Sequence, residues 1–242
     1  RFINPKMREK YGVDAMGETA ENLAELYKIS REDQDKFAMW SQQKTATAAQ
    51  SGIFSSEIVS VSISQKKGDD INFDKDEFSK PGTTLETLAK LKPAFKKEGT
   101  VTAGNASGLN DGAAALLLSS EEGLKNHKLN PIARIVSSAA AGVEPKIMGI
   151  GPVEAANKAL KRAALTWKDI DIIELNEAFA AQALACIRQW KIEDNDSRIN
   201  PNGGAIALGH PLGMSGSRIL LTAALELQRK NKKFAMVTMC IG

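Results

Sequence analysis

One ten-residue stretch restricts the fold of this chain more than any other feature. Residues 178–187 read Ala-Phe-Ala-Ala-Gln-Ala-Leu-Ala-Cys-Ile, and Gln182 is the single polar side chain among them. The stretch lies in a helix that we predict over 177–190. A helix that is apolar on every side is normally buried on every side. Such burial requires more layers than a three-layer sandwich has, or a second domain packed over the helix.

Helices and strands alternate around this stretch, which predicts an α/β fold with a largely parallel sheet. Alternating Val or Ile with Ser indicates a half-buried strand at 57–64, and a continuous apolar run indicates a strand covered on both faces at 113–118. The predicted strands are 57–64, 113–118, 131–141, 171–175 and 234–239. The predicted helices are 19–27, 31–50 capped by Ser30, 85–91, 177–190 and 215–229, with others beginning at Ser120 and Pro152. A surface loop is predicted over 65–81.

Composition excludes several classes of protein. The chain has 242 residues, 43% of them apolar and 25% charged, which is typical of a soluble protein of one large or two small domains. No apolar run approaches the roughly 20 residues of a membrane span. Two cysteines cannot form a disulfide framework, and a net charge of +3 gives no nucleic-acid footprint. We therefore expect neither nucleic acid nor membrane as a partner.

Common site motifs are absent from the sequence. It has no GxxxxGK[ST] phosphate loop and no GxSxG elbow, and Gly149-Ile-Gly151 lacks the third glycine of a dinucleotide fingerprint. The two cysteines and two histidines do not have metal-ligand spacing, so no metal site is expected. His127, between lysines and an asparagine, is expected to be a solvated helix-end residue.

Four segments combine residue types that could carry chemistry. Residues 200–216 form a glycine- and proline-rich loop around His210, which is either catalytic or a structural histidine in a tight turn. Asn176 and Glu177 follow a predicted strand, where the Asn176 amide either caps the next helix or positions a water or substrate group. Cys240 follows an apolar run and is either a buried core thiol or a strand-end nucleophile or base. Residues 100–113 are small and polar, and favour close packing.

Taken together, these segments resemble the thiolase family. The resemblance is carried by GTVTAGNASGLNDGAA at 99–114, NEAFAAQ at 176–182, NPNGGAIALGHPLGMSGSR at 200–218 and CIG at 240–242. The opening RFINPKM, with YGVDAM at 11–16, is most similar to the 3-oxoadipyl-CoA thiolases of aromatic degradation. The activity that the resemblance implies is that of an acetyl-CoA C-acyltransferase in fatty acid or aromatic compound degradation.

The resemblance also implies an architecture. Thiolases have a five-layer α/β fold, αβαβα, in which two similar halves share central helices, and the helix at 177–190 would be one of these. Residues 1–98 would be a partial loop domain, 99–129 the end of the N-terminal half, and 130–242 the C-terminal half without its last strands. Because the chain begins at Arg1 and ends directly after an apolar run, we expect a partial chain that lacks most of the N-terminal half.

The implied reaction breaks or makes the bond between the α and β carbons of a 3-oxoacyl-CoA, by thiolysis with CoA or Claisen condensation with acetyl-CoA. By resemblance, His210 would help to activate the nucleophilic cysteine and donate to the enolate oxygen, and Asn176 would hold the water of that oxyanion site. Cys240 would be the general acid/base, and the backbone amide of Gly242 would belong to the second oxyanion hole. A thiol suits this reversible proton transfer when its pKa is lowered.

The resemblance assigns a substrate pocket as well. Met16, Phe95, Ser107 and Phe179 match positions that line the pantetheine and acyl pocket, and Ser107 would hydrogen-bond the pantetheine. Coenzyme A is a substrate here, so no cofactor is implied. The implied assembly is a homodimer or homotetramer. We expect a cytoplasmic protein, and any organellar targeting signal would lie upstream of Arg1.

The implied nucleophile is not among these residues. In thiolases the acylated cysteine precedes the loop domain, and Cys186, in the middle of the predicted buried helix, cannot replace it. We therefore expect the 242 residues to be inactive alone. A thiolase-like protein that binds acyl-CoA or lipid without catalysis is the alternative. A decarboxylating ketosynthase uses two histidines with its cysteine, which Cys240 at the base position argues against.

Overall fold

The computed structural model describes residues 3–241. Its α-helices are α1 (Pro5–Tyr11), α2 (Met16–Leu26), α3 (Arg31–Gln50), α4 (Leu85–Ala89), α5 (Glu121–His127), α6 (Gly151–Ala163), α7 (Ala180–Gln189), α8 (Ala205–Leu208) and α9 (Ser215–Arg229). Its 3-10 helices are η1 (Ile53–Ser56), η2 (Pro145–Ile150) and η3 (Trp167–Asp169). Its strands are β1 (Val61–Ile63), β2 (Ile71–Phe73), β3 (Ile172–Leu175) and β4 (Ala235–Thr238).

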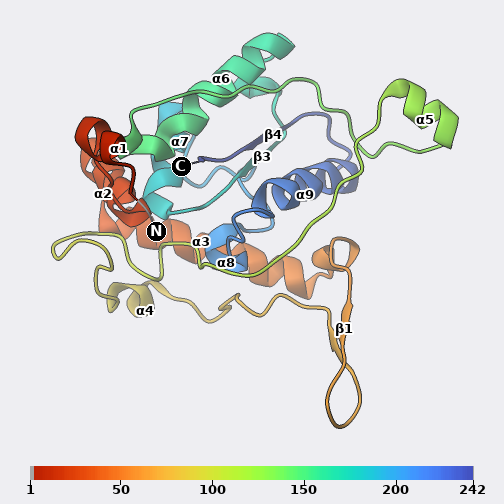
Figure 1. Ribbon diagram of the computed structural model, residues 1–242, viewed down its shortest axis with the longest axis horizontal. Helices are drawn as coiled ribbons and strands as arrows, with labels where there is room; N and C mark the ends of the chain where they lie inside the picture. The colour runs from red at the N-terminus through yellow and green to blue at the C-terminus, as the bar shows by residue number, and fades with distance from the viewer. Residues whose placement is uncertain (1–2, 242) are drawn as a thin grey trace.

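Helix α7 lies at the centre of the fold, as its composition predicts. Every residue from Ala180 to Ile187 is buried, and the main apolar core gathers around it from α2, α3, α6 and β3. Strands β3 and β4 run parallel to each other between α7 and α9 (Figure 1). The carboxyl ends of both strands therefore open on the same edge, next to the helices that cover the sheet.

Several local predictions are confirmed. The Ser30 hydroxyl accepts a hydrogen bond from the Asp33 amide and begins α3, which runs to Gln50 as predicted. Gly52 follows with a φ of 71°, the left-handed conformation that glycine adopts readily past a helix end. The predicted bounds of α9 are confirmed at both ends, and those of β3, β4, α2 and α4 within a few residues. Helix α7 begins three residues later than predicted, because Phe179 is extended.

Two predicted strands are wrong. Residues 113–118 and 131–141 have no strand structure, and Leu117 is 81% exposed. An apolar segment becomes a strand only where a neighbouring strand pairs with its backbone, and within residues 3–241 none lies beside either segment. Both segments therefore have the composition of core strands, but in this structure no described strand pairs with them.

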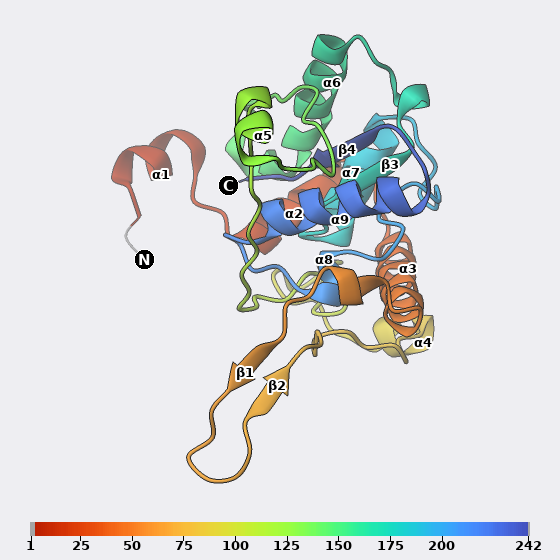
Figure 2. The ribbon, with the colours of Figure 1, turned by 90° about the vertical axis from the view of Figure 1, so that its right-hand side faces the viewer.

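The segment at 57–64 was predicted to be a half-buried strand. The prediction of burial is wrong. Its strand part, β1, pairs with β2 in an antiparallel hairpin that projects from the body of the molecule (Figure 2). All six strand residues are exposed, and β2 occupies part of the predicted loop at 65–81. The alternation placed the apolar side chains on one face, but no described segment covers that face.

Candidate active site

Asn176 and Cys240 come to one edge of the sheet through the pairing of β3 with β4. Leu175 pairs with Thr238, and the Asn176 amide donates to the Thr238 carbonyl at 3.0 Å. Asn176 thus lies one residue past β3, and Cys240 two residues past β4. Both residues therefore lie at the carboxyl ends of these parallel strands, where α/β sheets commonly bind their ligands.

The glycine-rich loop brings His210 to the same edge. Its amide donates to the Gly108 carbonyl at 3.1 Å, so the loop lies against the segment that holds GNASG. Gly209, with a φ of 93°, packs so closely on Asn110 that an added Cβ would lie 2.3 Å from its side-chain oxygen. Gly209 is therefore required both for its backbone conformation and for this contact.

Hydrogen bonds fix the tautomer of the His210 ring, which is 8% exposed. The Ser215 hydroxyl donates its one proton to the Pro211 carbonyl at 3.0 Å, so the His210 Nδ1–H must be the donor across the 2.6 Å to Ser215 Oγ. Nε2 then carries a lone pair and faces Asn176 Nδ2 at 3.3 Å. Burial lowers the pKa of His210, and the positive charge of Arg218 lowers it further. The resting imidazole is neutral, with Nε2 as an acceptor.

Asn176 offers an unused acceptor beside this ring. Its side chain is fully buried, and its Oδ1 has no hydrogen-bond partner among residues 3–241. Buried polar atoms are nearly always bonded to protein or to ordered water. The arrangement is therefore suited to binding a small polar group next to His210 Nε2.

Cys240 is half-buried, and burial raises the pKa of its thiol to about 11. The lowered pKa that would suit proton abstraction is therefore not found in this structure, in which the resting form is the protonated thiol. Gly242, predicted to supply an oxyanion-hole amide, lies outside the described residues.

Cys186 is confirmed as a core thiol. It is completely buried on α7, its Sγ lies 3.4 Å from the Gly149 carbonyl oxygen, and burial raises its pKa far above the usual range. A buried neutral thiol of this kind is chemically inert.

Glu177 anchors the site rather than facing it. Its carboxylate is 1% exposed and accepts hydrogen bonds from Ser41 Oγ (2.6 Å), Asn200 Nδ2 (2.7 Å) and the Ile206 amide (3.1 Å). These contacts hold α3, β3 and the glycine-rich loop together. All three donors are protein groups, so the contacts of Glu177 in this structure are structural.

The four predicted pocket residues fall in one neighbourhood. The rings of Phe95 and Phe179 meet edge to face, with centroids 5.9 Å apart, and Phe95 also lies directly over Gly17, next to Met16. Ser107 adjoins Phe179 through the bridge between residues 106 and 179, and its hydroxyl donates to the Ala178 carbonyl at 3.1 Å. Phe95 and Met16 are 42% and 46% exposed. An apolar, accessible surface therefore leads to the segment beside Asn176.

Two charged residues near the site were missed by sequence reasoning. Glu174 is 1% exposed on β3, and its Oε2 lies 3.9 Å from Arg218 Nη1 on α9. The signal that could have found Glu174 is its position two residues before Asn176, which places both on one face of the strand. Burial raises the pKa of Glu174 to about 8, against the opposing effect of Arg218.

This raised pKa predicts a stability difference that depends on pH. The folded protein holds a proton on Glu174 that the unfolded chain releases near 4.5, so its contribution is complete at low pH and is lost as pH rises through about 8. In Glu174→Gln, the amide mimics the protonated acid at every pH. Between pH 5 and 9, the free energy of unfolding of wild type should fall relative to the variant by several kcal/mol, at most about 5. Urea titrations measure this difference, and parallel curves for the two proteins would contradict it.

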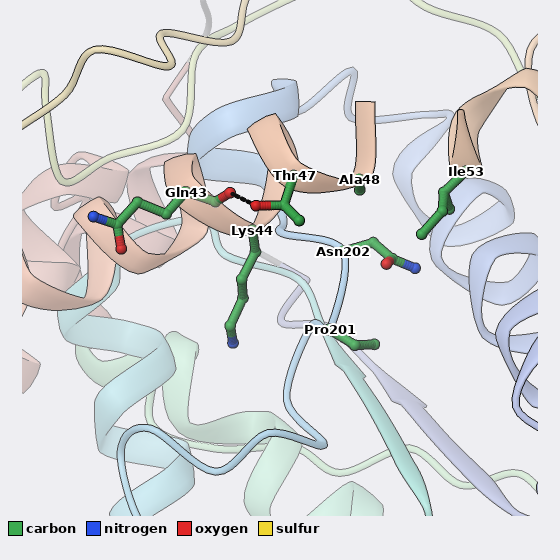
Figure 3. Close-up of a pocket in the computed structure, with 7 residues that line it drawn as sticks. All are labelled: Gln43, Lys44, Thr47, Ala48, Ile53, Pro201 and Asn202. Carbon is green, nitrogen blue, oxygen red and sulfur yellow. Dashed lines mark hydrogen bonds between the residues drawn. The ribbon is translucent and has the colours of Figure 1, made fainter. Parts of the chain in front are cut away.

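A surface hollow beside α3 contains none of the predicted site residues. It is lined by Gln43, Lys44, Thr47, Ala48, Ile53, Pro201 and Asn202 (Figure 3). Lys44 extends from the helix, and its ammonium group donates to the Ile199 carbonyl at 2.8 Å. The one charged group of this hollow is already bonded, and none of the residues that line it has a buried polar side-chain atom without a hydrogen-bond partner within residues 3–241.

Within the described part of the chain, no cluster of histidine, cysteine or acidic side chains could hold a metal ion, and no helix is long and apolar enough to cross a membrane.

Known proteins share the sequence and the fold. The model of the thiolase N-terminal domain matches residues 2–122, and that of the thiolase C-terminal domain matches residues 129–242. The crystal structure of the Bacillus anthracis acetyl-CoA acetyltransferase matches with a TM-score of 0.91 and 46% identity, over 95% of this chain and 57% of that one. Human mitochondrial 3-ketoacyl-CoA thiolase gives a TM-score of 0.89 and 51% identity, over 94% and 56%.

Similar sequences include thiolases of one subgroup. The beta-ketoadipyl-CoA thiolase of Acinetobacter baylyi is 56% identical over the whole chain, and the 3-oxoadipyl-CoA/3-oxo-5,6-dehydrosuberyl-CoA thiolase of Escherichia coli K12 is 57% identical. The chain spans 60% of the length of each of these relatives. Both thiolase domains are thus matched in order along the sequence, and the solved structures share the same mixed α/β fold. The chain belongs to the thiolase family.

Proposed function

We propose that the protein is an acetyl-CoA C-acyltransferase that reversibly cleaves a 3-oxoacyl-CoA with CoA. The observation that carries the proposal is the contact of His210 Nε2 with Asn176 at the strand edge beside Cys240. The names of the relatives favour 3-oxoadipyl-CoA as the substrate, and hence a role in aromatic compound degradation. A non-catalytic protein that binds acyl-CoA or lipid would not need this buried polar arrangement.

His210 and Asn176 would form the oxyanion site for the thioester enolate. The lone pair of Nε2 can take the proton of the nucleophilic thiol, and the resulting Nε2–H can then donate to the enolate oxygen. The free Oδ1 of Asn176 supports a role in holding the water that completes this site. The nucleophilic thiol in this proposal is neither Cys186 nor Cys240. We therefore expect the 242 residues to be inactive without it.

Cys240 would exchange the proton at the α carbon. In the cleavage direction, the enolate of the departing acetyl-CoA must be protonated, and a thiol with a pKa of about 11 carries that proton at rest. Condensation begins from the thiolate, which this environment disfavours. The raised pKa therefore supports cleavage as the direction for which the resting site is prepared. Gly242 would supply the amide of the second oxyanion hole.

The surface formed by Met16, Phe95, Phe179 and Ser107 would bind the pantetheine and acyl parts of the substrate. Coenzyme A would be a substrate, and no cofactor would be required. We further propose a homodimer or homotetramer in the cytoplasm. The assignment of residues 1–98, 99–129 and 130–242 to the loop domain and the two halves stays a prediction.

Steady-state assays of the complete enzyme, which includes the nucleophilic cysteine, test this proposal. We expect CoA-dependent loss of 3-oxoadipyl-CoA, with acetyl-CoA and succinyl-CoA as products, and slower loss of acetoacetyl-CoA. Reversal of this preference would contradict the substrate. Saturable acyl-CoA binding without product formation by the complete enzyme would contradict the activity and favour the binding protein.

A further inference from the structure

The two terminal nitrogens of Arg218 are buried and have no hydrogen-bond partner within residues 3–241. The Arg218 side chain as a whole is 15% exposed. The nearest carboxylate oxygen, Glu174 Oε2, lies 3.9 Å away, which is too far for a hydrogen bond. A guanidinium in such surroundings keeps its charge and acts on its neighbours through a medium that screens it poorly.

Arg218 and Glu174 lie on the same two elements as the residues that contact the imidazole ring of His210. On α9, Arg218 lies three residues after Ser215, so both are on one face of the helix, and Ser215 contacts His210 Nδ1. On β3, Glu174 lies two residues before Asn176, which contacts Nε2. The two residues that hold His210 and the two that form the charged pair thus share the layer between α9 and β3.

Glu174 does not cancel the charge of Arg218 at neutral pH. Burial raises the pKa of Glu174 to about 8, so its carboxyl is protonated below that pH. Burial also raises the pKa of Asp76, in the segment after β2, while the charge of Arg218 lowers it. The Cys240 thiol beyond β4 has a pKa raised by burial as well. The other ionisable groups that face Glu174 accept hydrogen bonds from donors of their own: Glu57 from Thr222 and Arg229, Glu177 from Ser41 and Asn200, and Glu226 from Asn202 and Arg229.

We propose that Arg218 is a positioning residue for His210, and that its guanidinium, held between α9 and β3, adds to the effect of burial in keeping the imidazole neutral with Nε2 free. This effect on the ring is independent of the reaction. That the neutral ring accepts the proton of the nucleophilic thiol rests on the proposed function. Glu174, neutral at the same pH, leaves the charge of Arg218 uncompensated toward the ring.

Histidine titration by NMR tests the proposal directly, because the chain has two histidines and the exposed His127 serves as an internal reference. In wild type, we expect His210 to titrate below about 6.5, the value of an unperturbed histidine, with the neutral form protonated on Nδ1. Titration of His210 at or above that value, or a neutral ring protonated on Nε2, would overturn the proposal without any variant.

Two matched variants separate charge from structure. Arg218→Gln removes the charge and should raise the proton affinity of His210 roughly three- to tenfold, whereas Arg218→Lys keeps the charge and should leave it near the wild-type value. His127 should not change in either variant. Equal shifts in both variants, or no shift in Arg218→Gln, would contradict a charge effect.

The pH profile of kcat/KM links this effect to activity. In Arg218→Gln the acidic limb should move to higher pH, and in Arg218→Lys it should not. A complete enzyme that is inactive, although His210 shifts as expected, would refute the proposed function and leave the charge effect standing. An active enzyme whose His210 and acidic limb do not respond to Arg218→Gln would refute this inference and leave the function standing.

Discussion

In the complete enzyme, replacing His210 by glutamine is expected to lower kcat for cleavage of a 3-oxoacyl-CoA by roughly 10²–10⁴-fold, the usual contribution of a positioned acid or base. The glutamine amide can still form hydrogen bonds, but it cannot take up the proton that Nε2 accepts in the native ring. KM should change much less than kcat, because the pocket residues around Phe95 and Phe179 are not altered.

His127→Gln is the matched control for this change. His127 lies exposed in the last turn of α5 and should give wild-type kcat when it is replaced. Discontinuous assays of product formation measure both effects. Circular dichroism checks that each variant is folded. A His210→Gln enzyme within tenfold of wild type would show that the ring is a structural histidine of the tight turn, the role that the sequence alone left open.

Cys240→Ser is expected to lower kcat by a similar factor, roughly 10²–10⁴-fold. A serine hydroxyl occupies nearly the same space as the thiol, but it is a much weaker acid and cannot exchange the α proton at a useful rate. The loss should be as large in the condensation direction as in cleavage, because the same group must both give and take that proton.

Cys186→Ala provides the comparison within the same chain. Cys186 is completely buried on α7, and we expect its replacement to lower stability slightly while kcat is retained. Activity assays and thermal unfolding of both variants decide between the two thiols. If Cys186→Ala abolished turnover in a folded protein while Cys240→Ser did not, the assignment of the acid/base to Cys240 would be wrong.

The sequence predicted those elements that depend on their own residues alone. The apolar residues at 178–187 require burial wherever they fold, and Ser30 caps α3 through contacts within four residues. The segments at 113–118 and 131–141 are different, because a strand depends on partners that are distant in sequence. Alternation at 57–64 likewise predicted which side chains share a face, but could not predict whether another segment covers it.

The same distinction holds at the site. The motifs identified His210, Asn176 and Cys240, and the structure joins the first two directly across 34 positions. Arg218 and Glu174 were missed because each is ordinary in its own segment, and they form a pair only when α9 packs on β3. The raised pKa of Cys240 follows from burial and could not be read from neighbouring residues.

Exchange of the methyl protons of acetyl-CoA with deuterium from solvent tests the central claim most directly. This exchange requires a base at the α carbon and donors to the enolate oxygen, the roles proposed for Cys240, His210 and Asn176, and does not require the acylated cysteine. The account predicts enzyme-dependent deuterium incorporation, measured by mass spectrometry, that Cys240→Ala abolishes and Cys186→Ala retains. Undiminished exchange in Cys240→Ala, or no exchange by a protein that binds acetyl-CoA, would contradict it.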